Sequence, residues 1–288
     1  MKELLTEPFL HNGNDFKEIN TKDISDLLSL RPEQLFQPHR VSFYVIHLFY
    51  EGFGKHSVDF NSIDIKEKHI LFVSPGQTAQ FHHPADYKGR VLIFTENFFC
   101  RNNAQTQFLG QTCLFNDPLK LPYFCVDDRF EEIVNLFGFI QKELERPFSE
   151  IKSSIINNYL FNILLIAEEL YHPMDTILDT HPYKILVSKC KSIANKDLSC
   201  QYPIQYFADQ LNVSIRTLEK AFVEVEKITP KKWLTERMIL EMKRNLVYNE
   251  ISISEIAYTL GFKEVTNFTK FFKAKTGQTP SQFRENLQ

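Results

Sequence analysis

The sequence predicts an α+β protein in which a sheet-rich first half is followed by an all-helical second half. Three observations lead to this prediction. Short β-type segments recur at even spacing over 36–99, apolar residues recur at helical intervals after about residue 127, and the last hundred or so residues contain a degenerate repeat. The chain has 288 residues, of which 43% are hydrophobic, so it can bury two cores. We therefore expect domains over 1–172 and 183–288, joined by a linker at 173–182.

Region 36–99 has the pattern of a small β-barrel or jelly-roll. Residues 41–50 are apolar on both alternating faces, which is typical of a strand packed on two sides. The two glycines of 51–54 predict a hairpin turn, and Pro75-Gly76 predicts a break in the run of strands. The remaining short strands are expected at 58–60, 63–65, 70–73 and 91–94.

Two amphipathic helices are expected after the barrel, over 128–145 and 149–171. Two interpretations of the second helix are equally consistent with the residues. It could pack on the barrel, or it could form a homodimer contact, because Ile155, Tyr159 and Ile166 recur at heptad-like spacing.

The last hundred or so residues contain two copies of a helix-turn-helix pattern, about 50 residues apart. Each copy has an alanine that lets a supporting helix approach a second helix closely. Each copy also has an Asn or Gly that can adopt the left-handed backbone of the turn between these helices. Ser214 is expected to cap the second helix of the first copy, and 252–255 is a capping box that opens the second copy. The matched positions are Ala208 and Ala257, Asn212 and Gly261, Leu218 and Phe268, Phe222 and Phe272, and Pro230 and Pro280.

Between the copies, 231–248 predicts one long helix with an apolar stripe. A helix of this length spans about 27 Å, less than one turn of DNA, so it could place two recognition helices in successive major grooves. The stripe consists of Trp233, Leu234, Met238, Met242 and Leu246.

Charge is divided unevenly between the halves. Residues 1–180 hold 16 Lys and Arg against 25 Asp and Glu, a net charge of −9. Residues 181–288 hold 17 against 11, a net charge of +6. An acidic first half and a basic second half are typical of a sensor joined to a nucleic-acid-binding domain.

These residues carry a family resemblance. The segment from about 184 to 286 closely resembles the DNA-binding domain of the AraC/XylS family of bacterial transcription regulators, most specifically at ISEIAYTLGF (253–262), NFTKFFK (267–273) and TGQTP (276–280). Less specifically, 36–99 is similar to the cupin-like sensor barrel of that family, at QPHR (37–40), EGFG (51–54) and SPGQ (74–77). The resemblance implies a cytoplasmic, sequence-specific DNA-binding regulator, an activator that responds to a small effector and has RNA polymerase as a partner.

The polar faces of the two recognition helices are the candidate DNA-binding surface. Arg216, Glu219 and Lys220 are expected to specify bases in one half-site, because steps of three and four place them on one helix face. Alternatively, Lys220 and Lys270 contact only phosphate. The full candidate set is Ser214, Arg216, Thr217, Glu219, Lys220, Val265, Thr266, Asn267, Thr269 and Lys270, with Thr266, Asn267 and Lys270 reading the second half-site.

The resemblance also suggests contacts for an effector and three departures from the family pattern. The first is Val265, which replaces a commonly polar position at the start of the second recognition helix. His39, Arg40 and Phe81 stand at positions similar to the ligand-facing ones, in what we expect to be a closed apolar pocket. Lys227 replaces a glycine of the first copy, so that corner is expected to be built differently. Ala79 stands where a cupin pocket often has histidine, so the resemblance carries over no metal.

A cupin-type metalloenzyme with an appended helical domain is the alternative function. Such an enzyme needs two or three His and a carboxylate around one metal. The barrel has no close H-x-H pair followed by Glu, and there is no phosphate-binding glycine loop or nucleophile elbow. We therefore expect no catalytic residue, metal or cofactor. The barrel histidines are His39, His47, His56, His69, His82 and His83.

Three further features bear on localisation. The five cysteines have no C-x-x-C spacing and fit reduced thiols. The first residues lack the apolar core of a signal peptide, and the longest apolar stretch is too short to cross a membrane. We therefore expect a cytoplasmic protein without a membrane contact.

Overall fold

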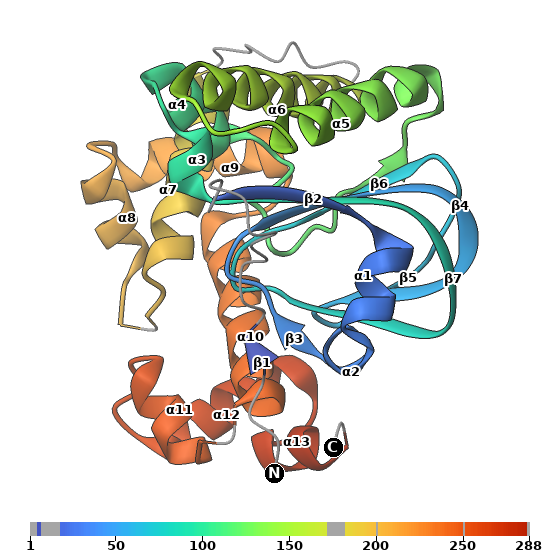
Figure 1. Ribbon diagram of the computed structural model, residues 1–288. Helices are drawn as coiled ribbons and strands as arrows, with labels where there is room; N and C mark the ends of the chain where they lie inside the picture. The colour runs from blue at the N-terminus through green and yellow to red at the C-terminus, as the bar shows by residue number, and fades with distance from the viewer. Residues whose placement is uncertain (1–4, 7–17, 172–181, 200, 250, 287–288) are drawn as a thin grey trace. The chain divides into compact units, whose positions relative to one another are not determined.

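The computed structural model describes residues 5–6, 18–171, 182–199, 201–249 and 251–286 (Figure 1). The described residues divide into two compact units, an N-terminal unit from Leu5 to Tyr171 and a C-terminal unit from Pro182 onward. Except for Pro182, the expected linker at 173–182 lies outside the described residues.

The N-terminal unit consists of one sheet and several helices. Its strands are β1 (Leu5–Thr6), β2 (Ile19–Asp23), β3 (His39–Arg40), β4 (Tyr44–Val58), β5 (Asn61–Asp64), β6 (His69–Val73), β7 (Thr78–Phe94) and β8 (Tyr123–Cys125). Its helices are α1 (Ile24–Leu30), α2 (Pro32–Leu35), α3 (Glu96–Phe99), α4 (Asn103–Gln111), the 3₁₀ turn η1 (Asp127–Arg129), α5 (Phe130–Leu144) and α6 (Glu150–Tyr171).

The eight strands form one sheet in the order β1-β3-β7-β4-β6-β8, with β2 paired to β7 and β5 paired to β4. Every pair is antiparallel except β1 with β3. The long strands β4 and β7 pair with each other along most of their length, and both bend strongly, so the sheet curves around its own interior (Figure 1). The expected sheet-rich first half is confirmed.

The hairpin expected at 51–54 is wrong. Residues 51–53 continue β4 and pair with β7, with register shifts on either side of this segment. Gly52 has a φ of 109°, and a Cβ built on it would lie 1.8 Å from the carbonyl oxygen of Asp86 on β7. The glycine therefore permits a close approach between two paired strands, where the sequence pattern suggested a chain reversal. The true reversal follows Val58, which pairs with Asn61 across a two-residue turn.

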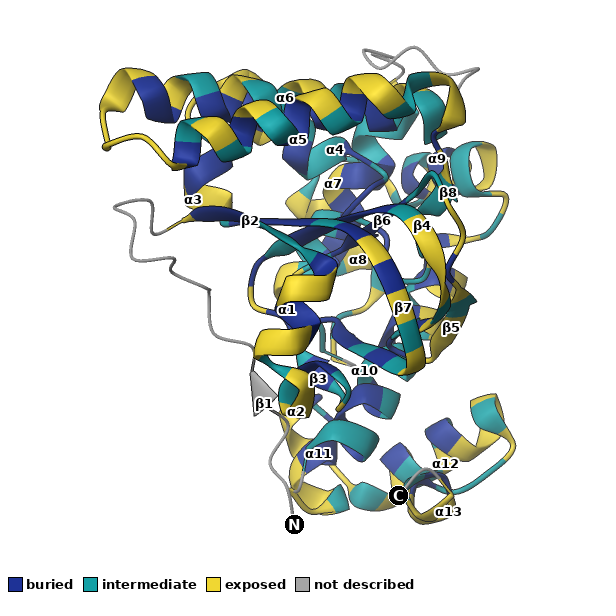
Figure 2. Ribbon diagram, turned by 45° about the vertical axis from the view of Figure 1, so that its right-hand side comes forward, coloured by how far each residue is buried: buried dark blue, intermediate teal, exposed yellow. Residues whose placement is uncertain are grey.

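Alternation along the central strands separates two apolar cores. Figure 2 marks the buried residues in dark blue. On β4, Ile46 and Leu48 belong to one core, whereas Val45 and Phe49 belong to the other. Side chains of a strand point alternately to opposite faces, so both faces of this strand are buried, as its apolar pattern predicted. The first core is completed by α3–α6, and the second lies inside the curved sheet beneath α1 and α2.

Helices α5 and α6 pack against each other and against the outer face of the sheet (Figure 1). On α5 the apolar residues that recur at helical intervals are buried, namely Ile133, Leu136, Phe137, Ile140 and Leu144. On α6, Ile166 is buried in this core, whereas Ile151 is 77% exposed. The packing of α6 on the barrel is therefore confirmed, and it leaves the side of the helix that carries Ile151 exposed. Within the described ranges, no helix has the length and hydropathy needed to cross a membrane.

The C-terminal unit contains seven helices among its described residues. They are α7 (Pro182–Lys196), α8 (Ile204–Gln210), α9 (Ile215–Glu226), α10 (Pro230–Tyr248), α11 (Ile253–Thr259), α12 (Val265–Thr276) and α13 (Pro280–Glu285). Helices α8 and α9 form the first helix-turn-helix motif and α11 and α12 the second. Helix α10 is the expected long connection and contacts α9, α11, α12 and α13. An α+β protein with a helical second half is therefore confirmed.

Candidate nucleic-acid interface and barrel interior

Both helix-turn-helix motifs make their turn with a residue in the left-handed region. Asn212 has a φ of 54° and Gly261 a φ of 85°. Asn tolerates this conformation better than most residues, and Gly adopts it freely. Gly261 has a second role, because a Cβ at this position would lie 2.2 Å from the Ser199 hydroxyl. Its carbonyl also accepts a hydrogen bond from the side-chain amide of Gln201 at 2.9 Å.

The same backbone hydrogen bond closes each turn. The amide of Val213 donates to the carbonyl of Ala208 at 3.0 Å, and the amide of Phe262 donates to the carbonyl of Ala257 at 2.9 Å. Both alanines are fully buried, so each supporting helix approaches its neighbour closely, as predicted. The two motifs therefore share one backbone geometry.

The two recognition helices begin differently. Ser214 caps α9 as predicted, because its hydroxyl accepts a hydrogen bond from the amide of Thr217 at 3.1 Å. Glu264 precedes α12 and makes no side-chain cap. Its carboxylate accepts instead from the hydroxyl of Thr266 at 3.1 Å. Helix α11 opens with the predicted capping box of Ser252 and Glu255.

The recognition helices end alike, which corrects the expectation at Lys227. Lys227 has a φ of 58° and Gly277 a φ of 82°, so both residues end their helix in the left-handed region. The lysine ammonium donates to the carbonyl of Glu224 at 2.8 Å and helps to satisfy the helix end. A lysine therefore builds the same corner as the glycine, at the cost of a less favourable backbone conformation.

The inner faces of α9 and α12 are apolar and completely covered. Leu218, Phe222, Phe268 and Phe272 are each 0% exposed. The ring centroid of Phe222 lies 6.2 Å from the ring centroid of Trp233 on α10. These contacts fix both recognition helices to the long connecting helix, as the apolar pattern predicted.

The outer faces carry the predicted DNA-binding residues. On α9, Arg216, Glu219 and Lys220 are exposed. The Nζ atom of Lys220 lies 5.5 Å from the ring centroid of Tyr183. Thr217 is half-buried beside its cap partner. On α12 and its edge the exposed members are Thr266, Asn267 and Lys270, and the half-buried ones are Val265 and Thr269. Each helix thus presents a compact polar face with a positive charge.

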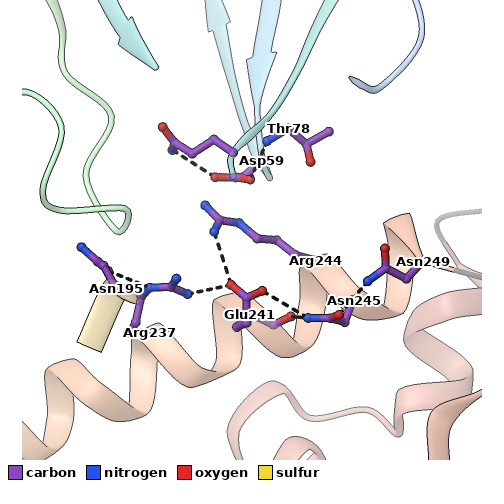
Figure 3. Close-up of polar contacts among 9 residues, drawn as sticks. Asp59, Thr78, Asn195, Arg237, Glu241, Arg244, Asn245 and Asn249 are labelled. Carbon is purple, nitrogen blue, oxygen red and sulfur yellow. Dashed lines mark hydrogen bonds and ion pairs between the residues drawn. The ribbon is translucent and has the colours of Figure 1, made fainter. Parts of the chain in front are cut away.

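A network along α10, which sequence reasoning missed, supports the connecting helix (Figure 3). The carboxylate of Glu241 accepts hydrogen bonds from Arg237 at 2.9 Å, Arg244 at 3.4 Å and Asn245 at 3.2 Å. Arg237 also donates to Asn195 of α7 at 3.2 Å. Spacings of three and four along a helix bring these side chains together and signal such a network in the sequence. The network links side chains along α10 with one another and with α7.

The curved sheet of the N-terminal unit encloses a narrow interior. His39 and Phe81 line this interior, whereas half-buried Arg40 is not among its lining residues. The space accommodates a water-sized molecule. Two of the three expected effector contacts therefore meet at one cavity.

Two further histidines line the same cavity and were not singled out as effector contacts. His47 and His56 are 4% and 0% exposed, and their ring centroids lie 5.2 Å apart. Among the described residues, nothing pairs with Nδ1 of His47 or with either nitrogen of His56. A buried polar group left without a hydrogen bond costs about 1–3 kcal/mol, so these nitrogens are a stability cost to the barrel. Strand alternation could have placed His47, because Val45 and Phe49 flank it on the same face.

Burial keeps the cavity histidines neutral. It lowers the pKa of His47 to about 3, and nearby His39 lowers it further. Burial also places the pKa of His56 well below its ordinary value, with a smaller effect of His47. The pKa of His39 is lowered by burial as well, against the opposing effect of hydrogen bonds to the carbonyls of Gln37 and Gln34. No group of three or more metal-ligating side chains occurs among the residues that the structure describes.

Comparison with known families accounts for both units. A family model described as an AraC-like ligand binding domain matches residues 25–172, and one described as a helix-turn-helix domain matches residues 207–286.

Known proteins are similar over most of the chain. The Msm operon regulatory protein of Streptococcus mutans is 25% identical over 248 residues, covering 85% of each chain. The HTH-type transcriptional activator RhaS of Yersinia pestis is 23% identical over 260 residues, covering 89% of this chain and 92% of RhaS. The crystal structure of ToxT from Vibrio cholerae aligns over 94% of this chain and 99% of its own, with 16% identity and a TM-score of 0.44. On the family matches, the protein belongs to the AraC family of transcription regulators.

Proposed function

We propose that this regulator binds two neighbouring DNA half-sites through the outer faces of α9 and α12. The observation that carries the proposal is the matched backbone of the two motifs, each of which leaves one polar, positively charged face uncovered. A polar helix face of this kind fits the major groove, where side chains can donate to and accept from base edges.

Within this surface we assign different roles to different residues. Arg216 can donate twice to a guanine, and Glu219 can accept from a cytosine. Thr266 and Asn267 can each donate to or accept from a base edge in the second half-site. Lysines elsewhere in the C-terminal unit would contact phosphates, which gives affinity without sequence information.

The N-terminal unit would act as the sensor. Its interior is lined by His39 and Phe81 and by many apolar side chains, and it would have to widen to admit a small organic effector. Binding there would change how the two units cooperate and so alter transcription. The named relatives are transcription regulators, so we assign the chain no reaction.

The surface of α6 is the proposed dimer contact. Ile155 and Tyr159 are only half-buried, and Ile151 is exposed at the start of the same helix. A second copy of the chain would cover these apolar side chains. We further propose a cytoplasmic location, with RNA polymerase as the partner that receives the signal.

The DNA-binding proposal is tested with the full chain and a random pool of duplex DNA. Rounds of selection should yield two sequence elements about one helical turn apart, and the affinity should fall steeply with salt concentration. The double variant Arg216→Ala/Lys270→Ala should lose the selected preference. The control Lys142→Ala removes one positive charge from an exposed position of α5, outside the proposed DNA-binding surface, and should behave as the native protein. Binding that is indifferent to both salt and sequence would contradict the proposal.

A further inference from the structure

One aliphatic side chain lies within the polar outer face of α9. Val223 is 49% exposed, whereas Phe222, its neighbour in the chain, is 0% exposed on the inner face. Steps of three and four along a helix place residues on one face, so Val223 continues the row that begins at Arg216 and passes Lys220. Among the residues of α9 and α12, all of which the structure describes, Val223 is the one large apolar residue that is exposed. The valine therefore lies inside the surface proposed to bind DNA.

Neither the fold of the motif nor solvation accounts for a valine at this position. Phe222 and Phe272 occupy matched positions in the two motifs, and one residue later Val223 corresponds to Lys273. Lys273 is exposed on α12, so the same backbone is built with a charged side chain there. Valine is also a poorer helix former than lysine, because its branched side chain loses rotamer freedom in a helix. Solitary exposed apolar residues are common, and it is the place of this one, among charged residues of a recognition helix, that indicates a role.

The major groove of DNA presents one apolar group to a side chain of this kind. The C5-methyl group of thymine projects into the groove, whereas the other base edges there carry hydrogen-bond donors and acceptors. A valine side chain has neither donor nor acceptor, so covering a polar base edge with it would leave that edge unsatisfied. Helices that lie in the major groove, such as those of homeodomains, read it with residues spaced i, i+3, i+4 and i+7. Counted from Arg216, Val223 is the i+7 residue.

We propose that Val223 is a specificity-determining residue, which contacts the C5-methyl group of a thymine in the half-site bound by α9. The inference rests on the proposed DNA-binding function. At about 1.5 Å per residue, Val223 and Arg216 are separated by about 10 Å along the helix axis, which equals about three base pairs at ~3.4 Å each. The thymine is therefore expected about three base pairs from the base that Arg216 contacts. Because the branched side chain of valine is already stiff in a helix, little rotamer freedom is lost when it packs against the methyl group.

Removal of a single methyl group from the DNA tests this contact. The full chain is first used to select its duplex site from a random pool. Each thymine of the selected site is then replaced in turn by uracil, which lacks the C5-methyl group and still pairs with adenine. We expect one replacement to weaken binding about fourfold, the effect of exposing one buried carbon of this size. A selected site in which no thymine binds more tightly than uracil overturns the inference.

Variants assign the methyl effect to one side chain. Val223→Ala shortens the side chain and favours the helix, so thermal stability should be kept while the preference for thymine over uracil at that position falls below about twofold. Val223→Ile keeps a branched aliphatic side chain and should retain a preference of about fourfold. Ile251→Ala is the matched control, because it changes another exposed aliphatic residue of the C-terminal unit, outside the recognition helices. Persistence of the thymine preference in Val223→Ala, or its equal loss in Ile251→Ala, contradicts the assignment.

The same measurements separate recognition from folding and distinguish the two proposals. If Val223→Ala loses thermal stability and binds thymine and uracil duplexes more weakly by the same factor, the role of Val223 is structural and the inference is overturned. Specific binding to the selected DNA in which no methyl effect depends on Val223 also overturns it, and leaves the DNA-binding function standing. Absence of any sequence-specific binding overturns the DNA-binding function, and this inference with it.

Discussion

The first and second helix-turn-helix motifs reach the same backbone with different residues. The turn uses Asn212 in one and Gly261 in the other, and the helix end uses Lys227 in one and Gly277 in the other. The first motif thus places non-glycine residues in the left-handed region twice, and the second does so at neither of these positions. Burial of matched apolar side chains against α10 outweighs the small cost of these conformations.

The difference between the motifs lies on their outer faces. Helix α9 presents Arg216 and Glu219, which carry opposite charges, whereas α12 presents uncharged Thr266 and Asn267. The shared backbone and the divergent faces show which positions shape the motif and which are open to specify DNA. The predictions below test this division.

The largest expected effect is a loss of folding stability when the apolar core shared by the two motifs is changed. Phe222→Ala and Phe268→Ala each remove a fully buried ring and should each lower the free energy of unfolding by about 3–5 kcal/mol. Urea denaturation followed by Trp233 fluorescence and circular dichroism measures both. Phe271→Ala, at a half-buried neighbour, is the matched control and should cost less. A loss below about 1 kcal/mol in only one of the pair would show that the motifs do not depend equally on α10.

The next effect concerns the outer faces. Arg216→Ala should reduce discrimination at one base pair by roughly 1–3 kcal/mol, because a bidentate contact to guanine is lost. Affinities for a library of half-site variants, measured at one salt concentration, give this value. If Lys270 contacts only phosphate, Lys270→Ala weakens every sequence by a similar factor. A uniform loss in Arg216→Ala as well would remove its base-reading role.

A smaller loss of stability is expected when the two glycines in the left-handed region of the C-terminal unit are replaced by alanine. Gly277→Ala should cost about 1–2 kcal/mol through its left-handed backbone alone, since nothing lies near the new Cβ. Gly261→Ala should cost more, because its Cβ would also approach the Ser199 hydroxyl. Thermal unfolding of both variants checks the order. Ser199→Ala in the Gly261→Ala background should restore part of the difference, and the absence of any rescue would exclude the clash as the cause.

The smallest effect is at the starts of the recognition helices. Ser214→Ala should cost about 1 kcal/mol by removing the cap of α9. Glu264→Asp should instead stabilise α12 by about 0.5 kcal/mol, because aspartate caps well and keeps a negative charge at the helix start. Chemical denaturation of the two single variants should therefore give changes of opposite sign. The same sign in both would show that α12 is already capped in another way.

The sequence was most informative where the pattern is local and periodic. The turn residues Asn212 and Gly261, the Ser214 cap and the long helix were all predictable, because each depends on a few neighbouring residues. The error at 51–54 has a different origin. A pair of glycines indicates only that the backbone is unusual. Whether it forms a turn or a close contact between strands depends on the pairing partner on β7, which is distant in sequence.

The candidate sites were predictable to different degrees for the same reason. The polar faces of α9 and α12 follow from helical periodicity, so their exposure could be read from the residues. His47 and His56 are nine positions apart on β4, and their rings lie close together in space because the strand bends between them. No local pattern contains that information.

The neutral imidazoles of the barrel have a consequence for proton uptake during unfolding. All nine histidines of the chain lie before residue 182, and His39, His47 and His56 have pKa values lowered by burial. In the unfolded chain each of these groups would take up a proton near pH 6.5, whereas the folded barrel resists it. Below that pH the unfolded state binds more protons, so the stability of the N-terminal unit should decline by up to about 1.4 kcal/mol per pH unit for each histidine, until the pH falls through the folded pKa values. Calorimetric scans between pH 7 and 5 should therefore show mild acid destabilising the barrel while leaving the helix-turn-helix motifs, which contain no histidine, nearly unaffected.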